Sequence, residues 1–76
     1  MIPKERTRAA RLLRMGMHPQ LILHKLQEER AVDEAEFIGV VQSWQKLGFA
    51  TPNVSWSLVG MTPTGLEFME KYGRLT

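Results

Sequence analysis

Residues 32–72, VDEAEFIGVVQSWQKLGFATPNVSWSLVGMTPTGLEFMEKY, contain the start and stop signals of two helices and a short hairpin between them. Asp33 stands three residues before a glutamate and just before an apolar run, as is typical of a capped helix start. Gly48 follows the last apolar residue of this run, at the usual left-handed stop position. Thr62 and Pro63 form a second start signal, because threonine caps a helix and proline fits its first position.

The first of these helices, expected from Asp33 to Leu47, has two distinct sides. Its apolar residues recur at the i, i+3, i+4, i+7 spacing of a helix that packs one side against a core. The residues expected to point inward are Phe37, Val40, Val41, Trp44 and Leu47. The opposite side is small and polar, with Ala35, Gly39, Gln42 and Lys46 at its centre and Ile38, Ser43 and Glu36 beside them.

Two short runs rich in β-forming residues, 49–51 and 56–61, flank Pro52-Asn53 and predict a two-stranded hairpin. Trp56 and Leu58 alternate with serines, so we expect one side of this ribbon to pack inward. The helix that follows carries a broad apolar arc that either closes the core or contributes to a dimer interface. That arc consists of Leu66, Phe68, Met69 and Tyr72.

The first fifteen residues predict a helix with a basic outer side, since they hold five of the ten basic residues and a single acid. Guanidinium groups bind phosphate through paired donors, so this side is a candidate phosphate contact. A solvated surface, or a surface that attracts an acidic protein, explains the same pattern. The basic side consists of Lys4, Arg8, Arg11 and Arg14, and the inward side of Ala9, Leu12 and Leu13.

A further helix is expected from Pro19 to about Arg30, after a stop at Gly16. Its buried stripe is predicted to be Ile22, Leu23 and Leu26, which leaves Leu21 as a partly exposed apolar contact. The turn at residues 31–33 is short enough to set this helix and the next at a sharp angle, as in a helix-turn-helix.

Composition limits the class of protein. A chain of 76 residues with 43% hydrophobic residues forms one domain, residues 1–76, near the size at which a single core is only just sufficient. It has no cysteine, and its net charge of +2 permits a nucleic-acid partner without requiring one. A charged N-terminus and the lack of a long apolar run predict a cytoplasmic protein without a signal peptide or membrane span.

No motif for catalysis, a cofactor or a metal is present. The sequence lacks a glycine-rich phosphate loop, a Gly-x-Ser-x-Gly motif and a Cys/His pair. His18 and His24 are six residues apart and have no carboxylate at a ligand-like interval, so we expect surface or capping roles for them. A domain this small also has little room for a small-molecule substrate pocket. We therefore expect a protein that is not an enzyme and uses no cofactor.

The sequence resembles the winged helix-turn-helix superfamily in two motifs, Leu47-Gly48-Phe49 and the stretch MTPTGLEFM at residues 61–69. Small MarR-like, PadR-like and phage-borne regulators have a leucine, glycine and apolar residue after the recognition helix, then a strand that ends in an LT-x-x-G pattern before a helix. The resemblance implies a mainly α fold with a three-helix core, a two-stranded wing and a C-terminal helix. It also implies transcription regulation through the third helix and the wing.

The first functional hypothesis is therefore a small regulator that binds double-stranded DNA as a homodimer. Gln42 can bond adenine N6 and N7, and Ser43 and Lys46 stand beside it for bases or backbone. Gly39 costs about 1 kcal/mol in a helix interior, which indicates either close approach by a partner or relief of crowding within the fold. The phosphate contacts of this hypothesis are Arg8, Arg11 and Arg14.

The alternative hypothesis is a protein-interaction module, such as a phage-encoded inhibitor or adaptor, that does not bind DNA. Asp33, Glu34 and Glu36 lie at the start of the third helix, where a recognition helix usually enters the groove. The expected wing tip at residues 51–55 has no lysine or arginine, although wings that grip DNA usually carry one. The contact surface of this alternative is Leu21, Ile38, Gly39 and Gln42.

Overall fold

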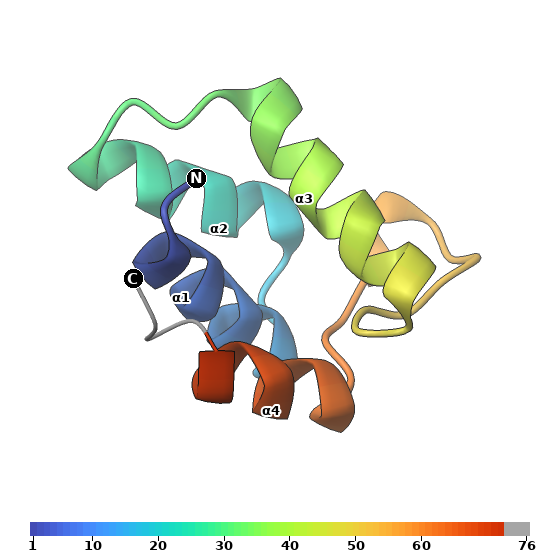
Figure 1. Cartoon of the computed structure of the whole chain (residues 1–76). Coiled ribbons are helices and arrows are strands. Elements are labelled where there is room, and N and C mark those ends of the chain that lie inside the picture. Colours follow the sequence, from blue (N-terminus) through green and yellow to red (C-terminus); the bar gives the residue numbers. More distant parts are fainter. Residues whose placement is uncertain (73–76) are drawn as a thin grey trace.

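The computed structural model describes residues 1–72 and shows four α-helices and one short 3₁₀ helix (Figure 1). The three N-terminal helices enclose the core, and α4 returns to lie along α1. In chain order the elements are α1 (Pro3–Arg14), α2 (Pro19–Glu29), α3 (Glu34–Leu47), η1 (Trp56–Leu58) and α4 (Pro63–Tyr72).

The expected helix boundaries are confirmed by the groups that cap them. The Asp33 carboxylate accepts the N–H of Glu36 at 3.1 Å and begins α3. Gly48 ends that helix at a φ of 77°, in the left-handed region that glycine adopts without strain. The Thr62 hydroxyl accepts the N–H of Gly65 at 3.1 Å and begins α4. His18 caps α2, since its Nδ1 accepts the N–H of Gln20.

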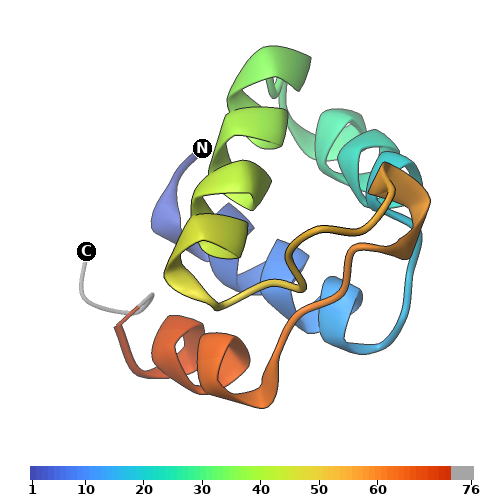
Figure 2. The same cartoon turned by 90° about the vertical axis from the view of Figure 1, so that its right-hand side faces the viewer.

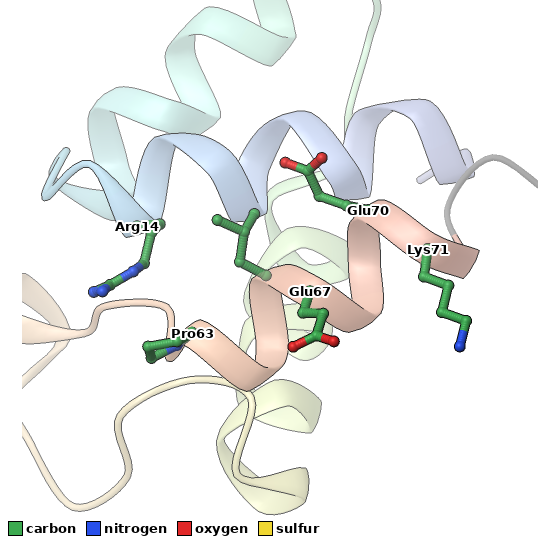
Figure 3. A pocket seen from close by; sticks show the side chains of 6 residues that line it. Arg14, Pro63, Glu67, Glu70 and Lys71 are labelled. Carbon is green, nitrogen blue, oxygen red and sulfur yellow. The ribbon is translucent and has the colours of Figure 1, made fainter.

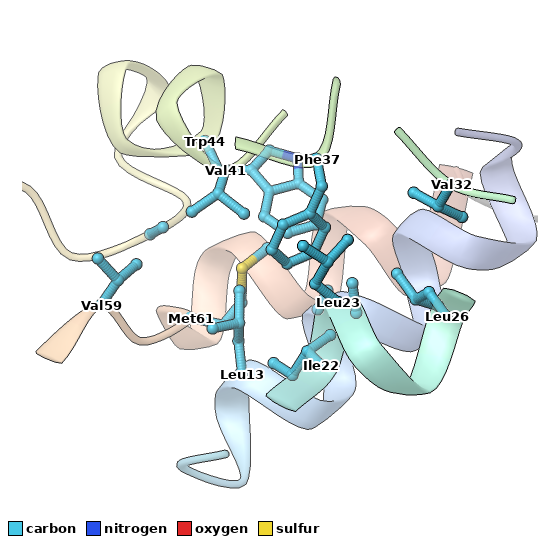
Figure 4. Packing of buried hydrophobic residues seen from close by; sticks show 13 residues of the cluster. Leu13, Ile22, Leu23, Leu26, Val32, Phe37, Val41, Trp44, Val59 and Met61 are labelled. Carbon is cyan, nitrogen blue, oxygen red and sulfur yellow. The ribbon is translucent and has the colours of Figure 1, made fainter. Parts of the chain in front are cut away.

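A single cluster of buried apolar side chains lies between α1, α2 and α3 (Figure 4). The predicted stripe of α2 is confirmed, and so are the central inward residues of α3. At the end of α3 the prediction is wrong for Leu47, which is 65% exposed because the chain turns away at Gly48. The buried cluster consists of Ala9, Ala10, Leu13, Ile22, Leu23, Leu26, Val32, Phe37, Val41, Trp44, Ala50, Val59 and Met61.

The predicted two-stranded wing is absent from the described residues, 1–72, which contain no strand or sheet (Figure 2). The only pairing between its two expected halves is an isolated antiparallel bridge between Ala50 and Met61. Beyond this bridge the backbone bonds locally: the N–H of Leu58 donates to the carbonyl of Ser55, and that of Val59 to the carbonyl of Trp56. The prediction of a mainly α fold with a β-hairpin wing, a winged helix-turn-helix, is therefore wrong.

Side-chain packing explains why residues 56–58 form a turn of 3₁₀ helix instead of a strand. The Trp56 ring packs edge-on against Phe37, with ring centroids 6.2 Å apart and an interplanar angle of 89°. The 3₁₀ turn leaves Leu58 68% exposed, so the expected inward alternation of Trp56 and Leu58 is also wrong. One large ring packed against the core outweighs the weak β-propensity of a three-residue run.

A close backbone contact positions α4. A Cβ added at Gly65 would lie 2.3 Å from the carbonyl oxygen of Phe49 and 2.7 Å from its Cα, so only glycine fits. The Thr62 hydroxyl lies within hydrogen-bond distance of the same carbonyl at 2.9 Å, and the Phe49 ring stacks on Phe68 with centroids 4.7 Å apart. On its other side α4 is joined to α1, where Arg11 bonds Glu70.

A buried carboxylate links the start of α1 to the end of α2. Glu5 is buried, and its two oxygens accept hydrogen bonds from the Arg30 guanidinium at 2.8 and 2.9 Å. The pKa of Glu5 is lowered from 4.5 to about 2, chiefly by the Arg30 hydrogen bonds, which together with a bond from the Ile2 N–H outweigh the opposing effect of burial. Because Arg30 immediately precedes the turn into α3, this pair also helps to place that helix.

Substitution of Gly65 by alanine should destabilise the protein strongly. The added methyl group would overlap the Phe49 backbone, and overpacking of this kind costs about 1–3 kcal/mol or more. Urea unfolding followed by circular dichroism measures the loss. The matched control is Gly39→Ala, because that helical glycine has nothing within 4 Å of its added Cβ and should keep or gain stability. Equal effects of the two substitutions would contradict this account of Gly65.

Stability should also fall in acid through the Glu5–Arg30 pair. The pKa of Glu5 is lower in the folded chain than the ordinary 4.5, so the pair stabilises the fold above pH 4.5. This contribution is lost as the pH falls from 4.5 toward about 2. Urea midpoints measured across this interval should fall more steeply for the wild-type chain than for Glu5→Gln, which cannot titrate at this position. Parallel pH profiles would contradict the assignment.

Candidate nucleic-acid interface

The outer side of α3 is the exposed surface that the sequence predicted. Gln42, Ser43 and Lys46 are all exposed and share this side of the helix with Gly39. Ile38 is half-buried at its edge. The structure thus brings together the three residues predicted to face bases or backbone. The exposed residues of this side are Ala35, Glu36, Gly39, Gln42, Ser43 and Lys46.

Gly39 is not required by the packing of the chain. A Cβ added at this position would find nothing within 4 Å, so the glycine relieves no crowding within the fold. In a helix interior glycine is about 1 kcal/mol less favourable than alanine. Gly39 therefore lowers helix propensity without relieving a steric contact among the described residues. It leaves a smooth strip of backbone on the outer side of α3, open to a molecule outside the domain.

A groove of about 600 Å³ separates the end of α3 from the loop that follows it, and polar side chains form much of its lining. The loop is held by a hydrogen bond from Nε2 of Gln45 to the carbonyl oxygen of Thr51 at 3.0 Å. Asn53 stands at its tip with a φ of 58°, a left-handed conformation that asparagine tolerates better than most residues. The lining residues are Gln42, Gln45, Lys46, Pro52, Asn53 and Val54.

The charge on α3 is divided between its two ends. Lys46 lies in the last turn and has no ion-pair partner among residues 1–72. Asp33, Glu34 and Glu36 are exposed at the first turn, where they complement the helix dipole. Glu36 pairs with the amino group of Met1. An anionic partner would therefore be attracted to the C-terminal half of α3 and repelled by its N-terminal half.

The arginines predicted to contact phosphate lie on the other side of the core from this surface. The apolar side of α1 faces the core that α3 also covers, and its basic side contacts α2 and α4. Arg8 pairs with Glu29 of α2, and Arg11 bonds Glu70 of α4 at 3.0 and 3.3 Å. Arg14 has no ion-pair partner in the described part of the chain.

The residues of the protein-interaction alternative lie on two helices. Leu21 is exposed in the first turn of α2, whereas Ile38, Gly39 and Gln42 share the outer side of α3. Gln45 and Asn53 also line the groove at this surface, although no pattern in the sequence predicts it. The Pro52-Asn53 pair did indicate a turn, but its position beside Lys46 follows from the Gln45 bond, which has no signature in the sequence.

Residues 1–72 contain no group of three or more His, Cys, Asp or Glu side chains that could hold a metal ion. Within the same residues, no helix combines the length and the apolar character needed to cross a membrane. Comparison of the chain with known protein families, curated proteins and solved structures finds no match. Any function assigned to the chain must therefore rest on its own surfaces.

Removal of the Gln45 side chain should loosen the loop beside α3. Gln45→Ala leaves the Thr51 carbonyl without this donor, at a cost of about 1 kcal/mol, and should speed hydrogen exchange of the amides in residues 51–55. Exchange followed by NMR measures both effects. The matched control is Gln42→Ala, an exposed glutamine on the same helix that should leave the loop amides unchanged. Unchanged exchange in Gln45→Ala would show that this bond does not hold the loop.

Proposed function

We propose that the chain is a small DNA-binding regulator that contacts duplex DNA through the outer side of α3. The observation that carries the proposal is Gly39, a helical glycine without a packing role, in line with exposed Gln42, Ser43 and Lys46. A strip of this kind lets a helix approach the floor of a major groove. DNA contact in this proposal comes from the outer side of α3, because the expected wing is absent from residues 1–72.

Each side chain of this surface has a role that fits its chemistry. The Gln42 amide offers a donor and an acceptor, which suits the N7 and N6 groups of adenine. The Ser43 hydroxyl donates to the carbonyl of Gly39 at 2.9 Å, so its oxygen remains available as an acceptor. Lys46 supplies a positive charge at the groove beside Asn53 and contacts phosphate.

The position of the arginines limits the affinity that this surface can reach. A duplex held against α3 lies across the core from Arg8, Arg11 and Arg14, and two of these three already pair with carboxylates. In this proposal Lys46 contacts phosphate, and the arginines of α1 do not contact the duplex bound at α3. With one or two phosphate contacts, the slope of log affinity against log salt is about −1 to −2. We place such a regulator in the cytoplasm, which is where the DNA lies in a cell without a nucleus.

The second candidate function is a protein-interaction module that uses the same side of α3. The acids at the first turn favour it, because Asp33, Glu34 and Glu36 are exposed and repel phosphate. Half-buried Ile38 gives this surface an apolar edge that a protein partner can cover. Ile38→Asp should then abolish capture of a partner, whereas Lys46→Ala should have little effect on it.

The DNA-binding proposal is tested by fluorescence anisotropy with a random duplex of about 20 base pairs at low salt. We expect a dissociation constant on the order of 10⁻⁴ to 10⁻⁶ M, in the range of non-specific binding. Lys46→Ala should weaken binding to all sequences, and Gln42→Ala should change the preference among duplexes selected from a random pool. Arg11→Ala is the matched control, because Arg11 lies across the core and should have little effect.

Gly39→Ala separates binding from folding. The variant should unfold at the same or a higher urea concentration, because alanine is the better helix former, yet bind DNA several-fold less tightly. Loss of both stability and binding would point to a structural role for Gly39. Absence of binding by the wild-type chain at low salt would reject the DNA-binding proposal, and unaltered binding by Gly39→Ala would reject this surface.

A further inference from the structure

The outward side of α4 is a continuous exposed stripe with an aromatic centre. Its residues follow the i, i+3, i+4, i+7, i+8 spacing of one helix side. Phe68 and Tyr72 are 40% and 45% exposed, and their rings contact each other with centroids 4.7 Å apart. We call this stripe the α4 face; it consists of Thr64, Glu67, Phe68, Lys71 and Tyr72, all of them exposed.

An apolar groove of about 460 Å³ lies next to the α4 face, between α3 and α4. Phe68 belongs both to this groove and to the stripe, so the two form one surface. Exposed Leu47 extends it onto the end of α3. Large apolar side chains gathered in this way usually mark an interaction site. The groove is lined by Arg6, Val40, Ser43, Trp44, Leu47, Phe49, Phe68 and Met69.

The α4 face also carries two opposite charges that make no ion pair with any residue from 1 to 72. Figure 3 shows Glu67 and Lys71 directed away from α1, whereas Glu70 is directed toward it. Neither Glu67 nor Lys71 makes an ion pair within residues 1–72, although the Lys71 ammonium lies 5.4 Å from the centre of the Tyr72 ring. The two charges are one helical turn apart and flank Phe68.

The geometry points to a second copy of this chain as the molecule that covers the α4 face, with the two α4 helices antiparallel across a two-fold axis. With Phe68 on the axis, Thr64 of each copy lies opposite Tyr72 of the other, so a small side chain faces a large ring. Glu67 of each copy comes within reach of Lys71 of the other. The patch on one copy is thus complementary to the same patch on the other copy, as an isologous interface requires.

This self-complementarity favours a second copy over another occupant. With Phe68 on the axis, the Thr64–Tyr72 match occurs twice, once for each copy, and Glu67 stands two positions from direct opposition to Lys71 of the other copy, a gap that the lysine side chain spans. The groove beside the axis also adds the apolar surface of Leu47 and Phe68 to each copy's side of the interface. A 76-residue chain gains from this association, because a single core of this size is only marginally sufficient.

The interface is small, since α4 has ten residues, so we expect a dissociation constant on the order of micromolar. Sedimentation velocity of the wild-type chain over about 1 to 500 μM should show a monomer that converts to a dimer across this range. Glu67→Lys and Lys71→Glu should each weaken the dimer by about tenfold or more, because each leaves two like charges on each copy facing two on the other.

The charge variants also test the antiparallel pairing directly. The double variant Glu67→Lys/Lys71→Glu should regain dimer formation, because opposite charges again face each other. An equimolar mixture of the two single variants should form a mixed dimer more strongly than either variant alone. Glu28→Lys is the matched control, since Glu28 is exposed on α2 and makes the same change of charge away from the α4 face. Circular dichroism confirms that every variant is folded.

Three results would overturn the proposal. The wild-type chain could remain a monomer at the highest concentration. It could form a dimer that the charge variants do not weaken, which would place the interface elsewhere. The single variants could fail to form a mixed dimer, which would exclude the antiparallel register. The proposal does not rest on DNA binding: Lys46→Ala should leave self-association unchanged, so either proposal can fail while the other stands.

Discussion

The surfaces of this domain depend on one contact, the approach of Gly65 to the backbone of Phe49. A side chain at position 65 would overlap that backbone, so glycine alone lets the first turn of α4 lie directly against the segment that leaves α3. The Thr62 hydroxyl lies within hydrogen-bond distance of the same carbonyl and also caps α4. The Phe49 ring stacks on the ring of Phe68. Close packing of this kind leaves little freedom to shift α4 without loss of the neighbouring contacts. It holds the start of α4 against the segment that follows α3, so that residues of both helices line the apolar groove between them.

The two sides of α3 differ in their surroundings. Its inner side, with Phe37, Val41 and Trp44, completes the core, while α4 and the segment after Gly48 cover only its end. The outer side stays free, and Gly39 makes it smooth without any benefit to the fold. The helix that completes the core therefore also presents a smooth, exposed side to the solvent.

Charge on α1 shows how tertiary structure changes the meaning of a sequence pattern. A row of arginines on one helix looks like a phosphate-binding surface, because the acids that could neutralise it are distant in sequence. In the folded chain Glu29 forms an ion pair with Arg8, and Glu70 forms one with Arg11. Buried Glu5 accepts two hydrogen bonds from the Arg30 guanidinium. Two of the three arginines proposed for phosphate are thus engaged within the domain, and all three lie across the core from α3. Spacing along a helix predicts which residues share a side, but not what that side faces.

Local signals in the sequence determined the four helices, their caps and most of the core. Helix periodicity, Asp33, Gly48, Thr62 and Pro63 act over a few residues, so they can be read without knowledge of the fold, and the exposed side of α3 follows from the same periodicity. The region after α3 could not be read in this way. Residues 49–61 have the composition of a hairpin, yet Trp56 packs against Phe37 and the backbone closes into a 3₁₀ turn, which leaves one bridge between Ala50 and Met61. The groove beside Asn53 and the pairing of the arginines were likewise decided by tertiary structure, because each depends on contacts that local sequence signals do not encode.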